Sequence, residues 1–297
     1  MVTGHRYAWT MERIRIITAT IILLTGTQFL DAAGTNSATF LQMGAGARAA
    51  AMGDAFTAIS DDVTATYWNP AGLAQIQNAQ LSLMQNSGFI DTNYQYLGGA
   101  FPIKDSSLGI SFYNLDHGSI DRYDNNNQKG GTFDSGSFSG NISLASNMDQ
   151  NLKFGLTAKF IQESIESESA TGFGADLGFL YNKNRYNFGL VLQHLGPGLK
   201  FEEEKFSLPQ TLRFGVSTKF FEDRLNTAFD LSKVKDDDVT VHLGSEYQVT
   251  QGAHLRAGYK VTPSNSLGVD GVTNITVGLG LLLGQFNIDY AFIPYGD

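Results

Sequence analysis

The chain has 297 residues, a net charge of −9, 33 glycines and no cysteine, and only 16% of its residues are charged. The absence of cysteine excludes disulfides and thiolate metal sites. The acidic balance, without a basic stripe to neutralise phosphates, argues against a nucleic-acid partner. The length would allow two domains, but β-barrels of this size are commonly one domain, and the glycine-rich and aromatic-rich composition favours that class.

Residues 1–34 are predicted to be a secretory signal peptide, with Met11 as an alternative start. Arg13 and Arg15 supply positive charge, residues 16–30 are mostly apolar, and small residues follow at 32–34, which is the pattern of a cleaved leader. A membrane anchor is the alternative, but the apolar run is short and contains four threonines. Lipoprotein processing is excluded because no cysteine follows the run.

Residues 35–77 are predicted to form a helical plug segment. Alanine is concentrated in residues 44–58, and small side chains suit a helix pressed closely against a wall. Ser60, Asp61 and Asp62 are expected to end this helix and to cap a second one over residues 63–67. Pro70 and Gly72 then predict a tight turn.

From residue 78 onward the apolar residues recur with a period of two. In residues 212–217, for example, Leu, Phe and Val alternate with Arg, Gly and Ser. The predicted fold class is therefore all-β, a transmembrane antiparallel β-barrel over residues 78–297 with an N-terminal helical plug segment. A soluble β-sandwich with its apolar faces inward is the alternative. The predicted strands are 78–88, 93–103, 107–115, 132–147, 151–162, 172–182, 185–195, 209–220, 224–232, 239–249, 253–260, 273–283 and 286–293.

Short and long connections alternate between these thirteen predicted strands, as short periplasmic turns and long extracellular loops do in outer-membrane barrels. The longer connections are 116–131, 163–171, 196–208, 233–238 and 262–272. An odd number of strands would leave an open edge in lipid, which is very unfavourable. We therefore expect about 14 strands, the last one missing from this sequence, with strands 78–88 and 286–293 at neighbouring positions and poorly paired.

Three stretches near the N-terminus, RAAAMGDAF (48–56), DD (61–62) and YWNPAGL (67–73), resemble the N-terminal signature of the PorV/PorQ family, relatives of the FadL outer-membrane transporters. Weaker similarity extends through SLPQTLRFGVS, LGSEYQV, LRAGYKV and IDYAFIPYG. The resemblance implies an outer-membrane β-barrel whose N-terminal segment lies in or under the lumen. The signature residues, for which we expect a structural role, are Arg48, Met52, Gly53, Asp54, Phe56, Asp61, Asp62, Trp68, Asn69, Pro70 and Gly72.

Within the signature, the charged residues Arg48, Asp54, Asp61 and Asp62 are predicted to form ion pairs in the plug. Phe56 and Trp68 are expected to pack rather than to stack on a substrate. Direct ligand contact by these residues is the alternative. In the structural interpretation, the charged residues hold the helices of the plug against a polar barrel wall.

No catalytic, cofactor-binding or metal site is predicted, and the chain is not expected to be an enzyme. Residues 44–49 match G-x-G-x-x-A, but no strand precedes them and no βαβ unit surrounds them. Residues 124–130 are rich in oxygen ligands but lack a glutamate at the twelfth position, where Ser135 stands, so a solvated loop is preferred over calcium binding. His242 and His254 lack an accompanying hydrolase or zinc motif.

Two functions follow from the resemblance. The first is an outer-membrane protein associated with protein secretion of the type IX kind, with lipid, secreted proteins and secretion-machinery components as partners. The second is FadL-like passage of hydrophobic small molecules across the outer membrane. A barrel hydrolase ranks last, since no motif supports it.

Overall fold

The computed structural model describes residues 36–297 except 88–91, 124–127, 202, 262–273 and 295–297. The predicted signal peptide lies outside the described residues, as does the whole of the predicted loop 262–272. In the described part, no helix is long and apolar enough to span a membrane.

Thirteen strands form one antiparallel sheet in the order β1-β2-β3-β4-β5-β6-β7-β10-β11-β12-β13-β14-β15. Their bounds are Gln80–Ser87 (β1), Asn93–Ile103 (β2), Ser106–Tyr123 (β3), Lys129–Asn147 (β4), Leu152–Ile165 (β5), Glu168–Lys183 (β6), Tyr186–Leu195 (β7), Thr211–Phe220 (β10), Leu225–Val234 (β11), Val239–Thr250 (β12), Ala253–Val261 (β13), Ile275–Leu283 (β14) and Phe286–Phe292 (β15). Each strand pairs with its neighbour in sequence, and only β7 and β10 are separated by a small hairpin, β8 (Leu199–Phe201) with β9 (Glu204–Phe206). All thirteen predicted strands are therefore confirmed.

The sheet carries its apolar side chains on the outside. Leu81 is 80% exposed and Leu255 57% exposed, whereas Lys159 and Arg213 are only 4% and 6% exposed. A soluble sandwich would show the reverse distribution, because water favours burial of the apolar face. An apolar outer face with a polar inner face is the arrangement of a sheet that contacts lipid.

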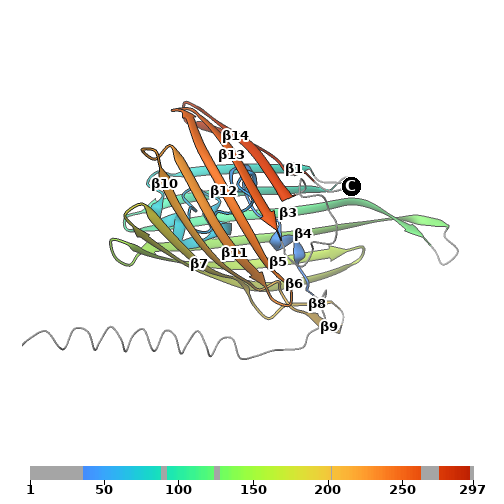
Figure 1. Ribbon diagram of the computed structural model, residues 1–297. Helices are drawn as coiled ribbons and strands as arrows, with labels where there is room; N and C mark the ends of the chain where they lie inside the picture. Colours follow the sequence, from blue (N-terminus) through green and yellow to red (C-terminus); the bar gives the residue numbers. More distant parts are fainter. Residues whose placement is uncertain (1–35, 88–91, 124–127, 202, 262–273, 295–297) are drawn as a thin grey trace, which may run out of the picture. The chain divides into compact units, whose positions relative to one another are not determined.

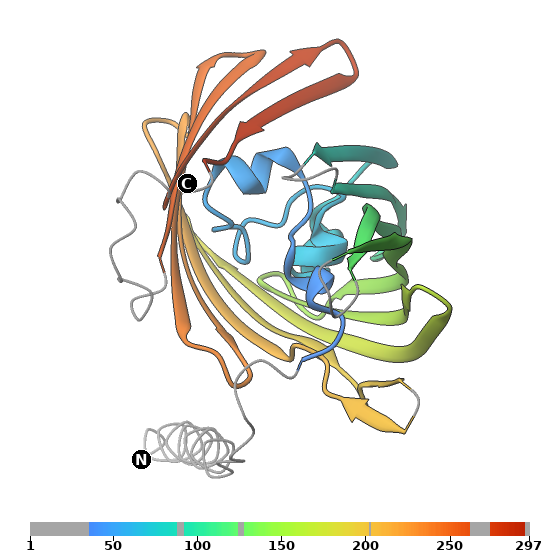
Figure 2. The ribbon, with the colours of Figure 1, turned by 90° about the vertical axis from the view of Figure 1, so that its right-hand side faces the viewer.

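The N-terminal segment, residues 36–77, lies within the curve of the sheet (Figure 2). It contains the short helices η1 (Thr39–Gln42), α2 (Ala47–Ala51), α3 (Ala65–Trp68) and η2 (Pro70–Gln75). The long first helix predicted from the alanines is wrong, because α2 ends where Gly53 and Asp54 take positive φ angles of 62° and 65°. The second predicted helix is displaced to residues 65–68, with Asp62 accepting a hydrogen bond from the Thr64 backbone N–H at 2.8 Å.

Two of the predicted long loops are largely strand. β3 and β4 continue through most of residues 116–131, past a bulge between Asp116 and Ser119 that contains Gly118 at a φ of 66°. β5 and β6 likewise pair as far as Ile165 and Glu168. The polar sequence predicted loops here, but cross-strand pairing with a neighbour extends the ladder beyond the apolar region. The β3–β4 hairpin projects beyond the other strands (Figure 1).

β1 and β15 are the two ends of the sheet, and no pairing joins them among the described residues. The sequence predicts that these two strands lie at neighbouring positions with a gap or a poor pairing between them. No ladder joins them in the described part of the chain, and their neighbouring positions stay a prediction. A fourteenth strand stays a prediction.

Candidate functional site: the N-terminal segment on the inner face

A row of glycines lets the N-terminal segment contact the sheet backbone directly. A Cβ atom at Gly258 would lie 2.0 Å from the Gly53 nitrogen, and one at Gly155 would lie 2.2 Å from the Ala71 nitrogen. Real Cβ atoms do not approach other atoms so closely, so these positions require glycine. We call this row the glycine band; its members that contact the segment are Gly98, Gly109, Gly155, Gly178, Gly189, Gly215, Gly244, Gly258 and Gly278.

The small residues of α2 pack against the glycine band. Ala51 is fully buried, and its methyl carbon lies 2.5 Å from where a Cβ at Gly278 would stand, whereas Ala50 is half-buried. We expect Ala51→Trp to prevent folding or to displace the segment, and Ala50→Trp to have a smaller effect. Heat-resistant migration on gels and protease protection of residues 36–77 measure both. Equal protection of the Ala51→Trp variant and the unchanged protein would contradict this packing.

Asp230, on the inner face of β11, binds the backbone of the N-terminal segment. It is fully buried, and its carboxylate accepts hydrogen bonds from the Phe56 and Thr57 backbone N–H groups at 3.0 and 2.8 Å. The Arg213 guanidinium lies 3.7 Å from the same carboxylate, donates to the Asp54 carbonyl at 2.8 Å, and covers the Trp68 ring at 4.8 Å. Backbone donors that cannot form helical hydrogen bonds are thereby satisfied by a charged group.

A chain of ion pairs runs from the segment to the last strand of the sheet. Arg48 contacts Asp61 at 2.6 Å and Asp62 at 3.2 Å, and it binds Glu246 of β12 through two hydrogen bonds at 2.8 and 2.9 Å. Burial opposes the charge of the Arg48 guanidinium, but Asp61 and Glu246 outweigh burial and raise the pKa of Arg48 well above its usual value. Arg256 of β13 continues the chain by contacting Glu246 and, on β15, Asp289, each at 2.6 Å.

The predicted ion pairs are thus present, with one difference. Asp54 pairs with Lys260 of β13 at 2.8 Å rather than with Arg48. Burial favours the neutral form of the Asp54 carboxyl, but Lys260, His242 and Arg213 together outweigh burial and lower the pKa of Asp54. Asp54 therefore remains a carboxylate that ties the end of α2 to the sheet.

The aromatic and turn residues of the signature pack within the segment. Trp68 and Phe56 are buried edge to face with ring centroids 6.4 Å apart, and the Trp68 indole N–H donates to the Ala45 carbonyl at 2.7 Å. The Asn69 amide donates to the Thr57 and Phe179 carbonyls and accepts from the Ala71 N–H, immediately before Pro70 begins η2. A Cβ at Gly72 would lie 2.0 Å from the Ser60 carbonyl oxygen. Met52 is buried against Gly244.

Sequence reasoning did not identify the wall residues that bind the segment. Besides Asp230 and Arg213 they include Gln193, which donates to the Tyr67 carbonyl, and His242, which bridges Ser232 and the Gly53 carbonyl. Each is a polar residue at an inward position of an alternating strand, which is the one signal that could have identified it. No group of three or more metal-ligating side chains is present within the described ranges.

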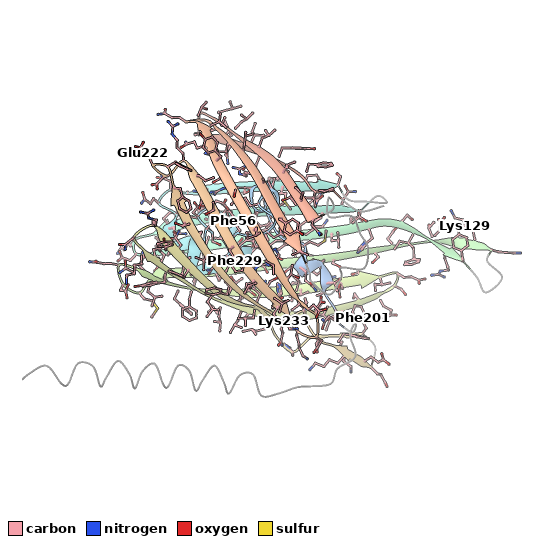
Figure 3. The ribbon with its side chains drawn as sticks, viewed as in Figure 1. Phe56, Lys129, Phe201, Glu222, Phe229 and Lys233 are labelled. Carbon is pink, nitrogen blue, oxygen red and sulfur yellow. The ribbon has the colours of Figure 1, made fainter. Side chains whose placement is uncertain are left out.

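Two cavities flank the segment. The outer-end cavity, of about 840 Å³, lies between the β5–β6 turn, the β8–β9 hairpin and residues 36–39, and its lining includes Ile165, Glu203, Phe201 and Phe206. The turn-end cavity, of about 500 Å³, lies between η2 and the short turns. Figure 3 marks these two ends by Phe201 on the β8–β9 hairpin and Glu222 in the β10–β11 turn.

Comparisons with known proteins identify both a family and a fold. Residues 65–292 match the family described as "Type IX secretion system membrane protein PorP/SprF". The structure resembles the Pseudomonas putida toluene transporter TodX (14% identity, TM-score 0.61, covering 84% of this chain and 91% of that chain) and a Pseudomonas aeruginosa FadL homologue (14% identity, TM-score 0.53, covering 80% and 86%). Likeness at this identity shows the fold, a FadL-like antiparallel barrel. Among curated proteins, none matches this chain.

Proposed function

Because the chain belongs to the PorP/SprF family of type IX secretion system membrane proteins, we propose that it is a docking component of secretion and not a conduit. It is an outer-membrane protein of a secretion family. The observation that carries the proposal is the glycine band, whose backbone contacts hold the N-terminal segment across the inner face of the sheet. A segment fixed across the inner face occupies the path that a transported molecule would take. The geometry therefore best supports a function in which partners bind at the two membrane surfaces.

The cell-surface side carries the longer hairpins. Short turns face the periplasm in outer-membrane barrels, so the long β3–β4 hairpin, the β5–β6 hairpin and the β8–β9 hairpin face outward. Partners here would be secreted proteins or other components of the secretion machinery. Neither family nor fold suggests catalysis, and we propose no enzymatic role.

The test is site-specific crosslinking from the two ends of the molecule. A photoreactive residue in place of Lys129, near the tip of the β3–β4 hairpin, is expected to capture secreted proteins or secretion components in intact cells. The matched control carries the same residue in place of Glu222, in the opposite short turn (Figure 3). Isolation of the barrel alone from both variants, in cells that actively secrete, would contradict the proposal.

A second candidate function is FadL-like passage of hydrophobic molecules. It is favoured by the volume of the outer-end cavity, about 840 Å³, which is large enough for a small ligand, and by Ile165, Phe201 and Phe206 in its lining, although five glutamates also line it. The toluene transporter that resembles this structure carries such a molecule. The test measures uptake of fatty acids and aromatic hydrocarbons by a strain that lacks this protein. If uptake of all of them equals that of the parent strain, this candidate function is excluded.

The finer kinship to PorV/PorQ stays a prediction. The stretches that carry that resemblance begin at Arg48, ahead of the residues 65–292 that match the PorP/SprF family. Both families are associated with the same type of secretion, so the docking proposal does not depend on the choice between them.

A further inference from the structure

The turn-end cavity is lined by cations and amides, in a chain whose net charge is −9. Its polar residues are Gln75, Gln77, Lys104, Asn147, Lys153 and Asn182, and no carboxylate lines it. The nearest acidic residues of the same turns are Asp105, beside Lys104 in sequence, and Asp149, whose carboxylate accepts the Asn151 and Leu152 backbone N–H groups. Among the described residues, the lysines that form ion pairs are Lys129, Lys159, Lys235 and Lys260, and neither Lys104 nor Lys153 is one of them. The Asp149 carboxylate nevertheless interacts electrostatically with Lys153.

Each of the two sides of the cavity is held in shape by its own hydrogen bonds, one set within the N-terminal segment and one set within the sheet. Gln75 donates to the Ile59 and Ser60 carbonyls at 2.8 and 3.3 Å. Lys153 donates to Asn182, and Asn182 donates to Asn187 at 2.7 Å. Because Gln75 and Asn182 are fixed by these bonds, a ligand would lose less free energy in ordering them, and it would bind through their remaining hydrogen-bonding groups and through the lysine ammonium groups.

We propose that the turn-end cavity binds an acidic peptide segment of a periplasmic protein. Two lysines supply charge for carboxylates, and the surrounding amides supply the paired donors and acceptors that a peptide backbone requires. The volume of about 500 Å³ lies within the range of ligand-binding cavities. The short turns beside it place it on the periplasmic side of the outer membrane.

The inference rests on the proposed function, since it supplies the chemistry by which a docking component would recognise a periplasmic partner. The proposed peptide site lies on the periplasmic side rather than on the cell-surface side, and it is tested by a different measurement. Crosslinking at Lys129 reports on the cell-surface side, whereas the binding measurement below uses the purified full chain alone. Either can fail while the other stands.

The probe is a fluorescent hexaglutamate peptide titrated against the detergent-solubilised protein, with hexaglutamine as the uncharged control. We expect hexaglutamate to bind and hexaglutamine to bind at least about tenfold more weakly. The Lys104→Glu/Lys153→Glu double variant should lose at least about tenfold in affinity, because each reversal replaces attraction by repulsion. Lys183→Glu, at the same end but outside the cavity, should bind as the unchanged protein does.

Each result decides. Heat-resistant gel migration shows which variants are folded, and a Lys104→Gln/Lys153→Gln variant, which keeps hydrogen-bonding side chains, replaces the double reversal if that fails to fold. No hexaglutamate binding, equal loss in Lys183→Glu, or full binding in the folded double variants would overturn the proposal. Competition by inorganic phosphate at the same concentration as the peptide would also overturn it, because the site would then be a general anion site.

Discussion

Gly258→Val is expected to abolish the folded barrel or to expel the N-terminal segment. The new Cβ would lie 2.0 Å from the Gly53 nitrogen and 2.3 Å from the Met52 carbonyl carbon. Both are backbone atoms, so no change of side-chain rotamer relieves the clash. Overpacking of a well-filled interior costs about 1–3 kcal/mol, occasionally more, and a backbone collision belongs at the upper end. Heat-modified gel migration and protease protection of the segment provide the measurement.

The matched control is Gly130→Val. Gly130 is exposed, and a Cβ there meets no heavy atom within 4 Å. This variant should migrate and resist protease as the unchanged protein does. If both valine variants behave alike, the glycine band does not hold the segment.

Asp230→Ala should produce the second large loss. The change removes the acceptor for two backbone N–H groups of the segment and leaves the buried Arg213 guanidinium without its carboxylate. Breaking a buried ion pair on one side costs about 3–5 kcal/mol. The midpoint of denaturant-induced unfolding in detergent, followed by gel migration, should fall accordingly.

Asp230→Asn separates hydrogen bonding from charge in this prediction. An amide oxygen still accepts from Phe56 and Thr57, so this variant should keep part of the stability that Asp230→Ala loses. The Asp230→Ala/Arg213→Met double variant should recover part of it too, since no uncompensated charge remains. A midpoint for Asp230→Ala equal to that of the unchanged protein would contradict the anchoring role.

The strands could be predicted from the sequence because alternation survives wherever one face meets lipid and the other does not. Residues 212–217 show this directly, with Leu212 and Phe214 exposed outside and Arg213 buried inside. The extension of β3 to Tyr123 could not be predicted, because beyond the bilayer both faces of a strand are exposed and the alternation disappears. The early end of α2 depends on positive φ angles at Gly53 and Asp54, which local helix propensity does not reveal.

The contacts of the N-terminal segment also include some that could be predicted from the sequence and some that could not. The ion pairs of Arg48 with Asp61 and Asp62 involve residues 13 and 14 positions apart, so their proximity could be anticipated within one short segment. The Asp230 bonds to Thr57 and Phe56 span 173 and 174 positions, and they depend on the sheet curving back around the segment. The alternation of the strands places the glycines of the glycine band on the polar face. Their contacts with the N-terminal segment depend on the three-dimensional structure and could not be predicted from the sequence.

In the proposed orientation, with the short turns in the periplasm, the β3–β4 hairpin extends outward from the cell surface. Its strands have 18 and 19 residues, whereas crossing the hydrocarbon core takes about 9–11. At about 3.3 Å per residue along the strand, the remaining eight or so residues add roughly 25 Å of ribbon beyond the hydrocarbon core. An antibody, a bacteriophage or a surface protease arriving from outside would meet this ribbon before the rest of the barrel, which makes its tip the natural place to insert an epitope for detecting the protein on living cells.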